Sequence, residues 1–230
     1  MKSVVISGGG SGLGKELGAL LTNKGTHAIL LGRTEKKLID AVEMIKKNGG
    51  EANYYVLDIT SHIEVEKTVS EIVKRYDVEL LINNAGVGHF GPFLEATNEE
   101  LLEMFQTNVF GSIYLTKSFL PLFQKNSAGT ILNIISTAGL RGKKNEALYV
   151  SSKFALRGFS ESLQKEYDGD AIRIVNAFMG GMDTPFWDKS DHISDKSRMR
   201  TPKEVAKMIL EELPVKDEIV IESKKKTSVC

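Results

Sequence analysis

Seven short, mainly apolar runs alternate with amphipathic stretches along the 230-residue sequence, and this alternation constrains the fold more than any other feature. Each run is too short for a helix, so we predict buried strands at residues 4–6, 28–31, 54–57, 80–82, 131–135, 172–175 and 219–221. Between the runs, apolar residues recur at the spacing of one helix face. We therefore expect six helices, near residues 13–21, 38–45, 65–73, 99–123, 147–167 and 205–209.

Strands that alternate with helices form right-handed crossovers and a parallel sheet that is covered on both faces. No internal repeat and no linker rich in Pro, Gly or Ser divides the sequence. We predict an α/β fold with one doubly wound domain over residues 1–222, followed by a polar C-terminal tail at 223–230. The one long segment without regular patterning is 188–201, which is typical of a loop.

The composition narrows the classes of function. Thirty basic and thirty acidic residues give a net charge of zero, which disfavours general nucleic-acid binding. The single cysteine, Cys230, excludes an intrachain disulfide and a cysteine-based zinc site, and the four scattered histidines predict no metal site. No apolar stretch reaches the length of a membrane span or a signal peptide, so we expect a cytoplasmic protein without membrane association.

A glycine-rich loop at residues 7–14, Ser-Gly-Gly-Gly-Ser-Gly-Leu-Gly, follows the first predicted strand and opens the first helix. Glycines allow close backbone approach, and the N–H groups of a helix N-terminus bind phosphate. One candidate ligand is a dinucleotide, with its pyrophosphate at residues 12–14. The other is a nucleoside triphosphate, because residues 9–15 read G-x-x-x-x-G-K. Glu16 then stands where such a loop needs Ser or Thr for Mg²⁺, so this alternative is weaker.

The G-x-x-x-G-x-G spacing of Gly8, Gly12 and Gly14 resembles the short-chain dehydrogenase/reductase family. Other motifs of that family occur in order, at 83–86 (Asn-Asn-Ala-Gly), Asn108, Ser136, Tyr149 with Lys153, and 179–184. The resemblance covers about residues 3–222 and extends to NADP(H)-preferring carbonyl reductases and 3-oxoacyl-carrier-protein reductases. It implies a Rossmann-type dinucleotide-binding catalytic domain. Met179 departs from the pattern, since the family usually has proline there.

Tyr149 and Lys153 are four residues apart and share one face of a predicted helix. Tyrosine has a pKa of about 10, and lowering it by roughly 3 units takes about 4 kcal/mol. One ammonium about 4 Å away supplies about that amount at an effective dielectric of about 20. We therefore expect Lys153 to lower the pKa of Tyr149, which acts as general acid on a ketone oxygen. By resemblance, Ser136 hydrogen-bonds the same oxygen and Asn108 holds a water that links Lys153 to solvent.

The resemblance also implies cofactor contacts. The backbone of Asn83 lies beside the adenosine half, Asp58 and Ile59 meet the adenine, and Met182 and Thr184 contact the nicotinamide carboxamide. The complete set of predicted cofactor-binding residues is Gly8, Gly10, Ser11, Gly12, Leu13, Gly14, Arg33, Asp58, Ile59, Asn83, Ala85, Gly86, Tyr149, Lys153, Gly180, Met182 and Thr184.

The residues after the second predicted strand indicate which dinucleotide is bound. Gly32 occupies the position where NAD-preferring members of the family carry an acidic residue for the ribose 2′-hydroxyl. Arg33 follows, and a guanidinium suits a 2′-phosphate. The alternative is a solvated loop in which Arg33 stacks on adenine in either cofactor. We favour NADP(H), with NAD(H) possible.

The sequence thus predicts an NADP(H)-dependent carbonyl reductase or alcohol dehydrogenase acting on a small-molecule ketone or secondary alcohol. The alternatives are a non-catalytic dinucleotide-binding regulator and, less favoured, a P-loop nucleotide hydrolase. The resemblance implies a homodimer or homotetramer formed through helices 99–123 and 147–167. The basic residues Arg141, Lys143 and Lys144 either attract an anionic substrate, such as an acyl-carrier chain, or form a solvated turn, which we favour.

Overall fold

The computed structural model describes residues 1–188, 190, 192–193 and 195–224. Most of the predicted polar tail, with Cys230, lies outside the described residues. The seven predicted strands form one parallel sheet with the order β3-β2-β1-β4-β5-β6-β7. They are β1 (Lys2–Ser7), β2 (His27–Gly32), β3 (Ala52–Val56), β4 (Asp77–Asn83), β5 (Gly129–Ser136), β6 (Ile172–Met179) and β7 (Glu218–Ile221). The predicted doubly wound α/β fold is confirmed.

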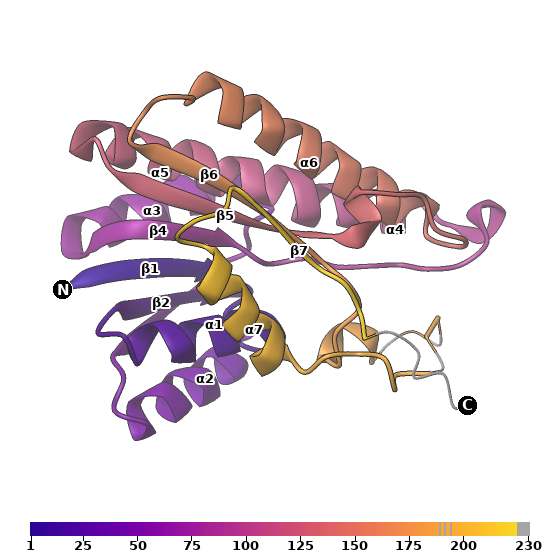
Figure 1. Ribbon diagram of the computed structural model, residues 1–230, viewed down its shortest axis with the longest axis horizontal. Helices are drawn as coiled ribbons and strands as arrows, with labels where there is room; N and C mark the ends of the chain where they lie inside the picture. Colours follow the sequence, from indigo (N-terminus) through magenta and orange to yellow (C-terminus); the bar gives the residue numbers. More distant parts are fainter. Residues whose placement is uncertain (189, 191, 194, 225–230) are drawn as a thin grey trace.

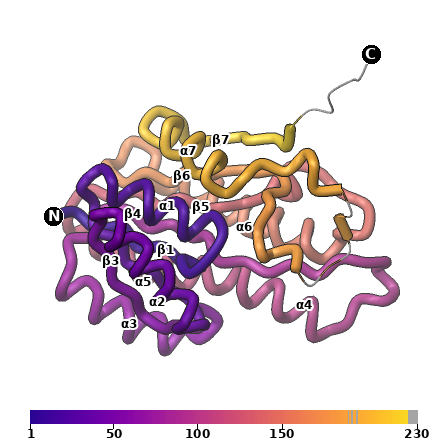
Figure 2. Tube along the Cα trace, turned by 90° about the horizontal axis from the view of Figure 1, so that it is seen from below, coloured from indigo at the N-terminus to yellow at the C-terminus, as the bar shows by residue number. Residues whose placement is uncertain are grey.

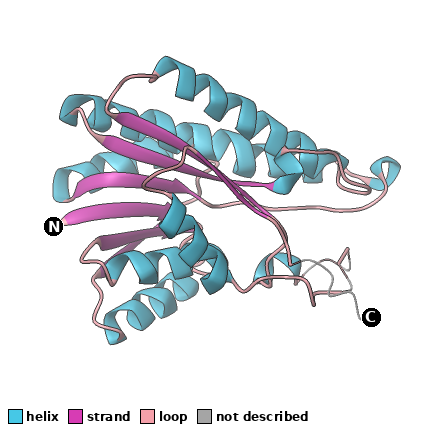
Figure 3. Ribbon diagram, viewed as in Figure 1, coloured by secondary structure: helices cyan, strands magenta, loops and turns pink. Residues whose placement is uncertain are grey.

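Helices cover both faces of the sheet (Figure 3). They are α1 (Gly12–Thr22), α2 (Glu35–Lys47), α3 (His62–Arg75), α4 (Asn98–Phe105), α5 (Gly111–Asn126), α6 (Ala147–Glu166) and α7 (Pro202–Glu212). The structure has seven α-helices in its described residues where we expect six, because the helix predicted at 99–123 is divided into α4 and α5. A π-helical turn at Gln106–Phe110 separates α4 from α5 without interrupting the helix, because the widened turn lets one buried side chain reach a neighbouring loop.

The alternation of side chains along the strands builds two cores. In β1, Val4 and Ile6 pack with α1, α2 and α7, whereas Val5 packs with α3, α5 and α6 on the other face. All three side chains are fully buried. A strand that is buried on both faces needs apolar residues at successive positions, which explains the continuous apolar runs of the sequence. Figure 1 shows the two helical layers on either side of the sheet.

The strand order reverses between β1 and β4. The chain runs outward from β1 to β2 and β3, and returns to the other side of β1 as β4. In open α/β sheets, the crevice outside the carboxyl ends of the strands at such a switch point is where ligands bind. Figure 2 shows α4 and the segment after β6 at one end of the molecule.

None of the helices in the described ranges is both long and apolar enough to cross a lipid bilayer.

Candidate active site

A cavity of about 940 Å³ lies at this crevice, near the upper end of the range of about 300–1,000 Å³ for ligand pockets. It extends from the glycine-rich loop to the segment after β6. Most of the predicted site residues line it: Gly8, Gly10, Ser11, Gly12, Leu13, Arg33, Asp58, Ile59, Ala85, Gly86, Ser136, Tyr149, Lys153, Gly180, Met182 and Thr184. Gly14, Asn83 and Asn108 are not among the lining residues.

The glycine-rich loop has the shape that a phosphate group requires. Gly8 and Gly12 have φ of 65° and 52°, a left-handed conformation that L side chains rarely adopt. A Cβ on Gly14 would lie 2.5 Å from the carbonyl oxygen of Gly8. Helix α1 begins at Gly12, and within the described chain the side chain of its N-cap residue Ser11 makes no capping hydrogen bond. The first N–H groups of α1 are therefore available, and this loop fits the pyrophosphate of a dinucleotide.

Two residues that the sequence reasoning left without a role hold this loop in place. The Oγ of Ser7 accepts hydrogen bonds from the backbone N–H groups of Asn84 (3.0 Å) and Ala85 (3.1 Å). The side-chain amide of Asn84 donates to the carbonyl oxygens of Ser7 (2.9 Å) and Gly8 (3.3 Å). The end of β4 is thereby fastened to the end of β1. The sequence signal was the second asparagine of the Asn-Asn-Ala-Gly motif.

Asn83 points away from the cavity. Its buried side-chain amide donates to the Oγ1 of Thr116 (3.0 Å) and the Oδ1 of Asn133 (2.9 Å). Since side chains alternate between the faces of a strand, Asn83 supports the sheet while Asn84 faces the glycine-rich loop. The predicted adenosine contact through the backbone of Asn83 stays a prediction.

Asn108 lies in the π-helical turn and is completely buried. Its Oδ1 accepts from the backbone N–H of Val87 (2.8 Å), and its Nδ2 donates to the carbonyl of Val87 (2.9 Å). Nδ2 also donates to the Oγ of Ser152 on α6 (3.0 Å). The side chain therefore ties the loop after β4 to the helix that carries Tyr149. Its expected water-holding role stays a prediction.

Ser136, Tyr149 and Lys153 come together in the middle of the cavity. The ammonium Nζ of Lys153 lies 5.7 Å from the centre of the Tyr149 ring and donates to the carbonyl of Ile134 at 3.4 Å. Ser136, at the end of β5, lines the cavity beside Tyr149 and lies close enough to lower the pKa of its phenol. Ser136 from β5 and Tyr149 and Lys153 from α6 thus line the same cavity.

The pKa of Tyr149 differs from the expectation. Burial raises the pKa of Tyr149, the hydrogen bond from Ser136 opposes this rise, and the negative charge of Glu146 adds to it. Burial also lowers the pKa of Lys153 to about 8. The expectation that Lys153 lowers the pKa of Tyr149 is therefore not met in the protein alone. Removal of the phenol from water outweighs the attraction of an ammonium that is itself desolvated.

The opposite end of the cavity contains Arg33, Asp58 and Ile59. The Oδ1 of Asp58 accepts from the N–H and the Oγ1 of Thr60, at 3.0 and 2.9 Å. Ile59 packs on Gly111, where a Cβ would lie 2.5 Å from its Cδ1. Arg33 is exposed at the cavity wall and forms no hydrogen bond or ion pair with any described residue. Its guanidinium is thus available to a ligand.

The segment after β6 closes over the glycine-rich loop. A Cβ on Gly12 would lie 3.3 Å from the methyl group of Thr184, so these two predicted residues face each other. The backbone carbonyl of Met182 accepts from the indole N–H of Trp187 at 3.0 Å. Met179, where the family usually has proline, is buried and pairs in register with Ser136.

An aromatic wall lies beside Tyr149. The ring of Phe90 is centred 5.3 Å from that of Tyr149, 5.1 Å from that of Trp187 and 6.0 Å from that of Phe186. The imidazole of His192 stacks on Phe90 at 4.8 Å. Aromatic side chains exclude water from the phenol and offer an apolar surface to a substrate.

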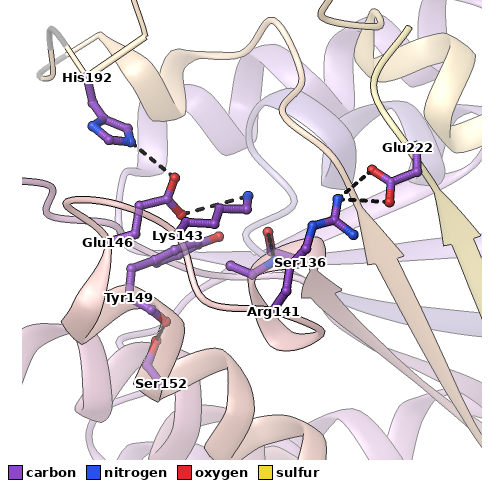
Figure 4. A network of polar contacts seen from close by, with 9 residues as sticks. Ser136, Arg141, Lys143, Glu146, Tyr149, Ser152, His192 and Glu222 are labelled. Carbon is purple, nitrogen blue, oxygen red and sulfur yellow. Dashed lines mark hydrogen bonds and ion pairs between the residues drawn. The ribbon is translucent and has the colours of Figure 1, made fainter. Parts of the chain in front are cut away.

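Two of the three basic residues near the site bind carboxylates (Figure 4). Arg141 Nη2 donates to both carboxylate oxygens of Glu222, at 2.9 and 3.0 Å. Lys143 Nζ lies 3.8 Å from Glu146 Oε2. Lys144 is exposed and does not line the cavity. Arg141 is thus engaged by a carboxylate distant in the sequence and Lys143 by one three residues away, whereas Lys144 is exposed, as expected for a solvated turn.

The profile of the short chain dehydrogenase family matches residues 2–194 of this chain. A diacetyl reductase of Staphylococcus epidermidis that forms (S)-acetoin is 32% identical over 193 residues, which cover 83% of this chain and 75% of that protein. The solved structure of an actinorhodin polyketide ketoreductase with NADPH is 26% identical, with a TM-score of 0.87 over 96% of this chain and 95% of the other. An alcohol dehydrogenase from the archaeon Thermococcus sibiricus, complexed with 5-hydroxy-NADP, is 26% identical with a TM-score of 0.86, over 100% of this chain and 98% of the other.

Proposed function

The chain belongs to the short-chain dehydrogenase family of oxidoreductases, and from this premise we propose that it is an NADP(H)-dependent reductase of small ketones that also oxidises the corresponding secondary alcohols. One observation carries the proposal. The side chains of Ser136, Tyr149 and Lys153 line one cavity that continues to the glycine-rich loop. The glycine-rich loop would hold the pyrophosphate of a dinucleotide, and the same cavity would then receive its nicotinamide on the side of Ser136 and Tyr149.

When bound, the nicotinamide dinucleotide supplies or accepts the hydride. The protein's own residues handle the oxygen and the proton. Ser136 donates a hydrogen bond to the carbonyl oxygen of the substrate and fixes its position. Tyr149, whose raised pKa keeps it protonated near neutral pH, transfers its proton to that oxygen as the alkoxide develops.

Lys153 acts on Tyr149 by charge. With a pKa of about 8 it is mainly protonated at pH 7. Its ammonium stabilises the phenolate that remains after proton transfer, more strongly than it would in water because both side chains are buried. Asn108 holds the backbone of Val87 and the helix of Tyr149 in place. We propose Ser136, Tyr149 and Lys153 as the catalytic residues and Asn108 as the residue that positions them.

Arg33 supports NADP(H) over NAD(H). Its exposed guanidinium lines the cavity wall beside Gly32, and Lys37 lies at the same end. Two positively charged side chains at this place favour the binding of a 2′-phosphate, whereas a ribose 2′-hydroxyl is bound by a carboxylate. The ketoreductase and the alcohol dehydrogenase named above were solved with NADPH and with 5-hydroxy-NADP, which supports the same preference.

Calorimetric titration of the protein with NADPH, NADH and Mg·ATP tests the proposal. We expect NADPH to bind more tightly than NADH, and ATP not to compete. Turnover is then followed as the loss of reduced-nicotinamide absorbance with diacetyl and acetophenone. NADPH binding without turnover of any ketone would favour a non-catalytic dinucleotide-binding regulator. Tighter NADH binding would keep the reductase and contradict the cofactor preference.

We also propose that the protein is a homodimer or homotetramer. Leu102 on α4, Phe110 in the π-helical turn and Phe154 on α6 are exposed by 56%, 45% and 42%. Apolar side chains that recur on neighbouring helices support association through α4, α5 and α6. Light scattering on the eluate of a sizing column measures the mass, and a monomer at assay concentration would contradict this assembly.

A further inference from the structure

The substrate end of the cavity, defined here by Tyr149, α4 and the segment after β6, is rich in carboxylates. Glu100, Glu103, Glu146 and Asp188 line it. The ammonium groups among the described lining residues of this end are those of Lys143 and Lys153. With the imidazoles neutral, four carboxylates face two ammonium groups, a net charge of −2. Any substrate that enters meets a negative potential.

Two histidines at this end are already engaged by carboxylates. His89 Nε2 lies 2.8 Å from Glu103 Oε2 and His192 Nε2 lies 3.1 Å from Glu146 Oε1. Arg141, which the sequence offers as a cation for an anionic substrate, is held by Glu222. A substrate carboxylate at this end would therefore find His89, His192 and Lys143 already engaged by carboxylates.

Glu146 stands out among these carboxylates because it is buried. Its side chain is 9% exposed, against 36% and 43% for Glu100 and Glu103. His192 bonds Oε1, whereas Oε2 accepts no hydrogen bond from the described residues and has only Lys143 Nζ at 3.8 Å. A carboxylate can accept about four hydrogen bonds, so Oε2 has capacity left for a ligand that enters the cavity. Figure 4 shows Glu146 between Lys143 and His192.

The position of Glu146 relates it to the reacting atoms. It precedes α6 directly, three residues before Tyr149, and both residues line the same cavity. Its negative charge is close enough to raise the pKa of Tyr149. A substrate whose carbonyl oxygen meets Tyr149 thus places its neighbouring carbon near Glu146.

We propose that Glu146 is a specificity-determining residue, whose Oε2 accepts a hydrogen bond from a hydroxyl or ammonium group beside the substrate carbonyl and which rejects carbonyl compounds with a carboxylate there. The inference rests on the proposed ketone reductase function and names its substrate class: hydroxy ketones and amino ketones. The aromatic wall of Phe90, Phe186 and Trp187 receives the apolar part of such a substrate.

Four ketones with the same phenyl group test this inference: acetophenone, α-hydroxyacetophenone, α-aminoacetophenone and phenylglyoxylate. Their intrinsic reactivities differ, so the measured quantity is the change, between the natural protein and a variant, in the ratio of kcat/KM for two ketones. Glu146→Gln keeps the shape and removes the charge. We expect the ratio of α-aminoacetophenone to phenylglyoxylate to fall at least about tenfold in Glu146→Gln.

Two further variants complete the design. Glu166→Gln makes the same change at the far end of α6, roughly 30 Å away for a helix of this length, and is expected to leave the ratio unchanged. Lys143→Met removes the cation beside Oε2 and exposes the full charge of Glu146. We expect it to move the ratio in the opposite direction, toward stronger rejection of phenylglyoxylate. Thermal melting checks that each variant is folded.

The outcomes separate the two proposals. If the natural protein reduces acetophenone but Glu146→Gln and Lys143→Met leave the ratio unchanged, the role of Glu146 is overturned and the reductase function stands. If no ketone is reduced, the reductase function fails. Binding then decides the role of Glu146, through quenching of Trp187, the single tryptophan of the chain and a cavity residue. Equal quenching by the amino ketone and by phenylglyoxylate would overturn it.

Discussion

The ammonium of Lys153 lies 5.7 Å from the centre of the Tyr149 ring, and both side chains are more than nine-tenths buried. Burial moves their pKa values in opposite directions, up for the phenol and down to about 8 for the ammonium. Near pH 7, Tyr149 is therefore protonated while Lys153 is still mainly charged. This is the pair of protonation states that reduction of a carbonyl needs, an acid with its proton in place and a cation to stabilise the phenolate.

Replacing Tyr149 by Phe removes the proposed proton donor and keeps the ring that packs on Phe90. We expect turnover to fall at least about 10²-fold with NADPH affinity nearly unchanged, as for the loss of a general acid. Steady-state kinetics and calorimetry measure the two quantities. Tyr167→Phe, at the C-terminal end of α6, is the control and should retain full activity. Near-normal turnover of Tyr149→Phe would contradict the assignment.

Lys153 lowers the stability of the protein at neutral pH. Its pKa is lower in the folded protein than in the unfolded chain, so the unfolded chain binds more protons between about pH 8 and 10.5. The free energy of unfolding therefore rises with pH through this window, and below it the full cost of about 3 kcal/mol is present. The hydrogen bond to the Ile134 carbonyl offsets about 1 kcal/mol of that cost.

Lys153→Met is thus expected to raise the free energy of unfolding at pH 7 by about 1–2 kcal/mol, while it removes activity. The difference from the natural protein should shrink toward about pH 9.5, where Lys153 is neutral in the fold. Urea unfolding at the two pH values measures this. A variant that is less stable at both would show that contacts beyond the hydrogen bond to Ile134 compensate the burial of the ammonium.

The fold could be predicted from the sequence because its determinants are local. Continuous apolar runs and helical spacing depend on residues close together in the chain, and they located each strand to within a few residues. The π-helical turn at Asn108 could not be found this way. It exists because the side chain of Asn108 reaches Val87, 21 residues earlier, and no local pattern encodes that contact.

The candidate site shows the same limit. The motif residues Ser136, Tyr149 and Lys153 were found by their spacing. The burial that sets their pKa values depends on how Phe90 and the segment after β6 close over them, which spacing does not reveal. The same is true of the ion pair between Arg141 and Glu222, which are 81 residues apart and meet only once the sheet has formed.

The cofactor preference depends on Arg33. Arg33→Ala is expected to weaken NADPH binding at least about tenfold more than NADH binding, because only NADPH carries the 2′-phosphate that a guanidinium binds. Calorimetry with both dinucleotides measures the two affinities. Arg75→Ala, an exposed arginine at the end of α3, should leave both unchanged. Equal losses for the two dinucleotides in Arg33→Ala would mean that this side chain contacts the adenine rather than the phosphate.

The glycine-rich loop leads to a prediction about a single methyl group. In Gly14→Ala the new Cβ would lie 2.5 Å from the Gly8 carbonyl and 2.6 Å from Asn84 Nδ2, the group that fastens the loop to β4. The loop must move, so we expect loss of dinucleotide binding and a loss of about 2 kcal/mol in the free energy of unfolding.

Gly142→Ala adds the same methyl where no atom lies within 4 Å. There we expect normal binding and a stability equal to or slightly above that of the natural protein, since alanine restricts the unfolded chain. Unfolding curves give the free energy of unfolding of both variants, and titration gives their affinity for NADPH. Tight NADPH binding by Gly14→Ala would contradict the prediction and place the dinucleotide elsewhere in the cavity.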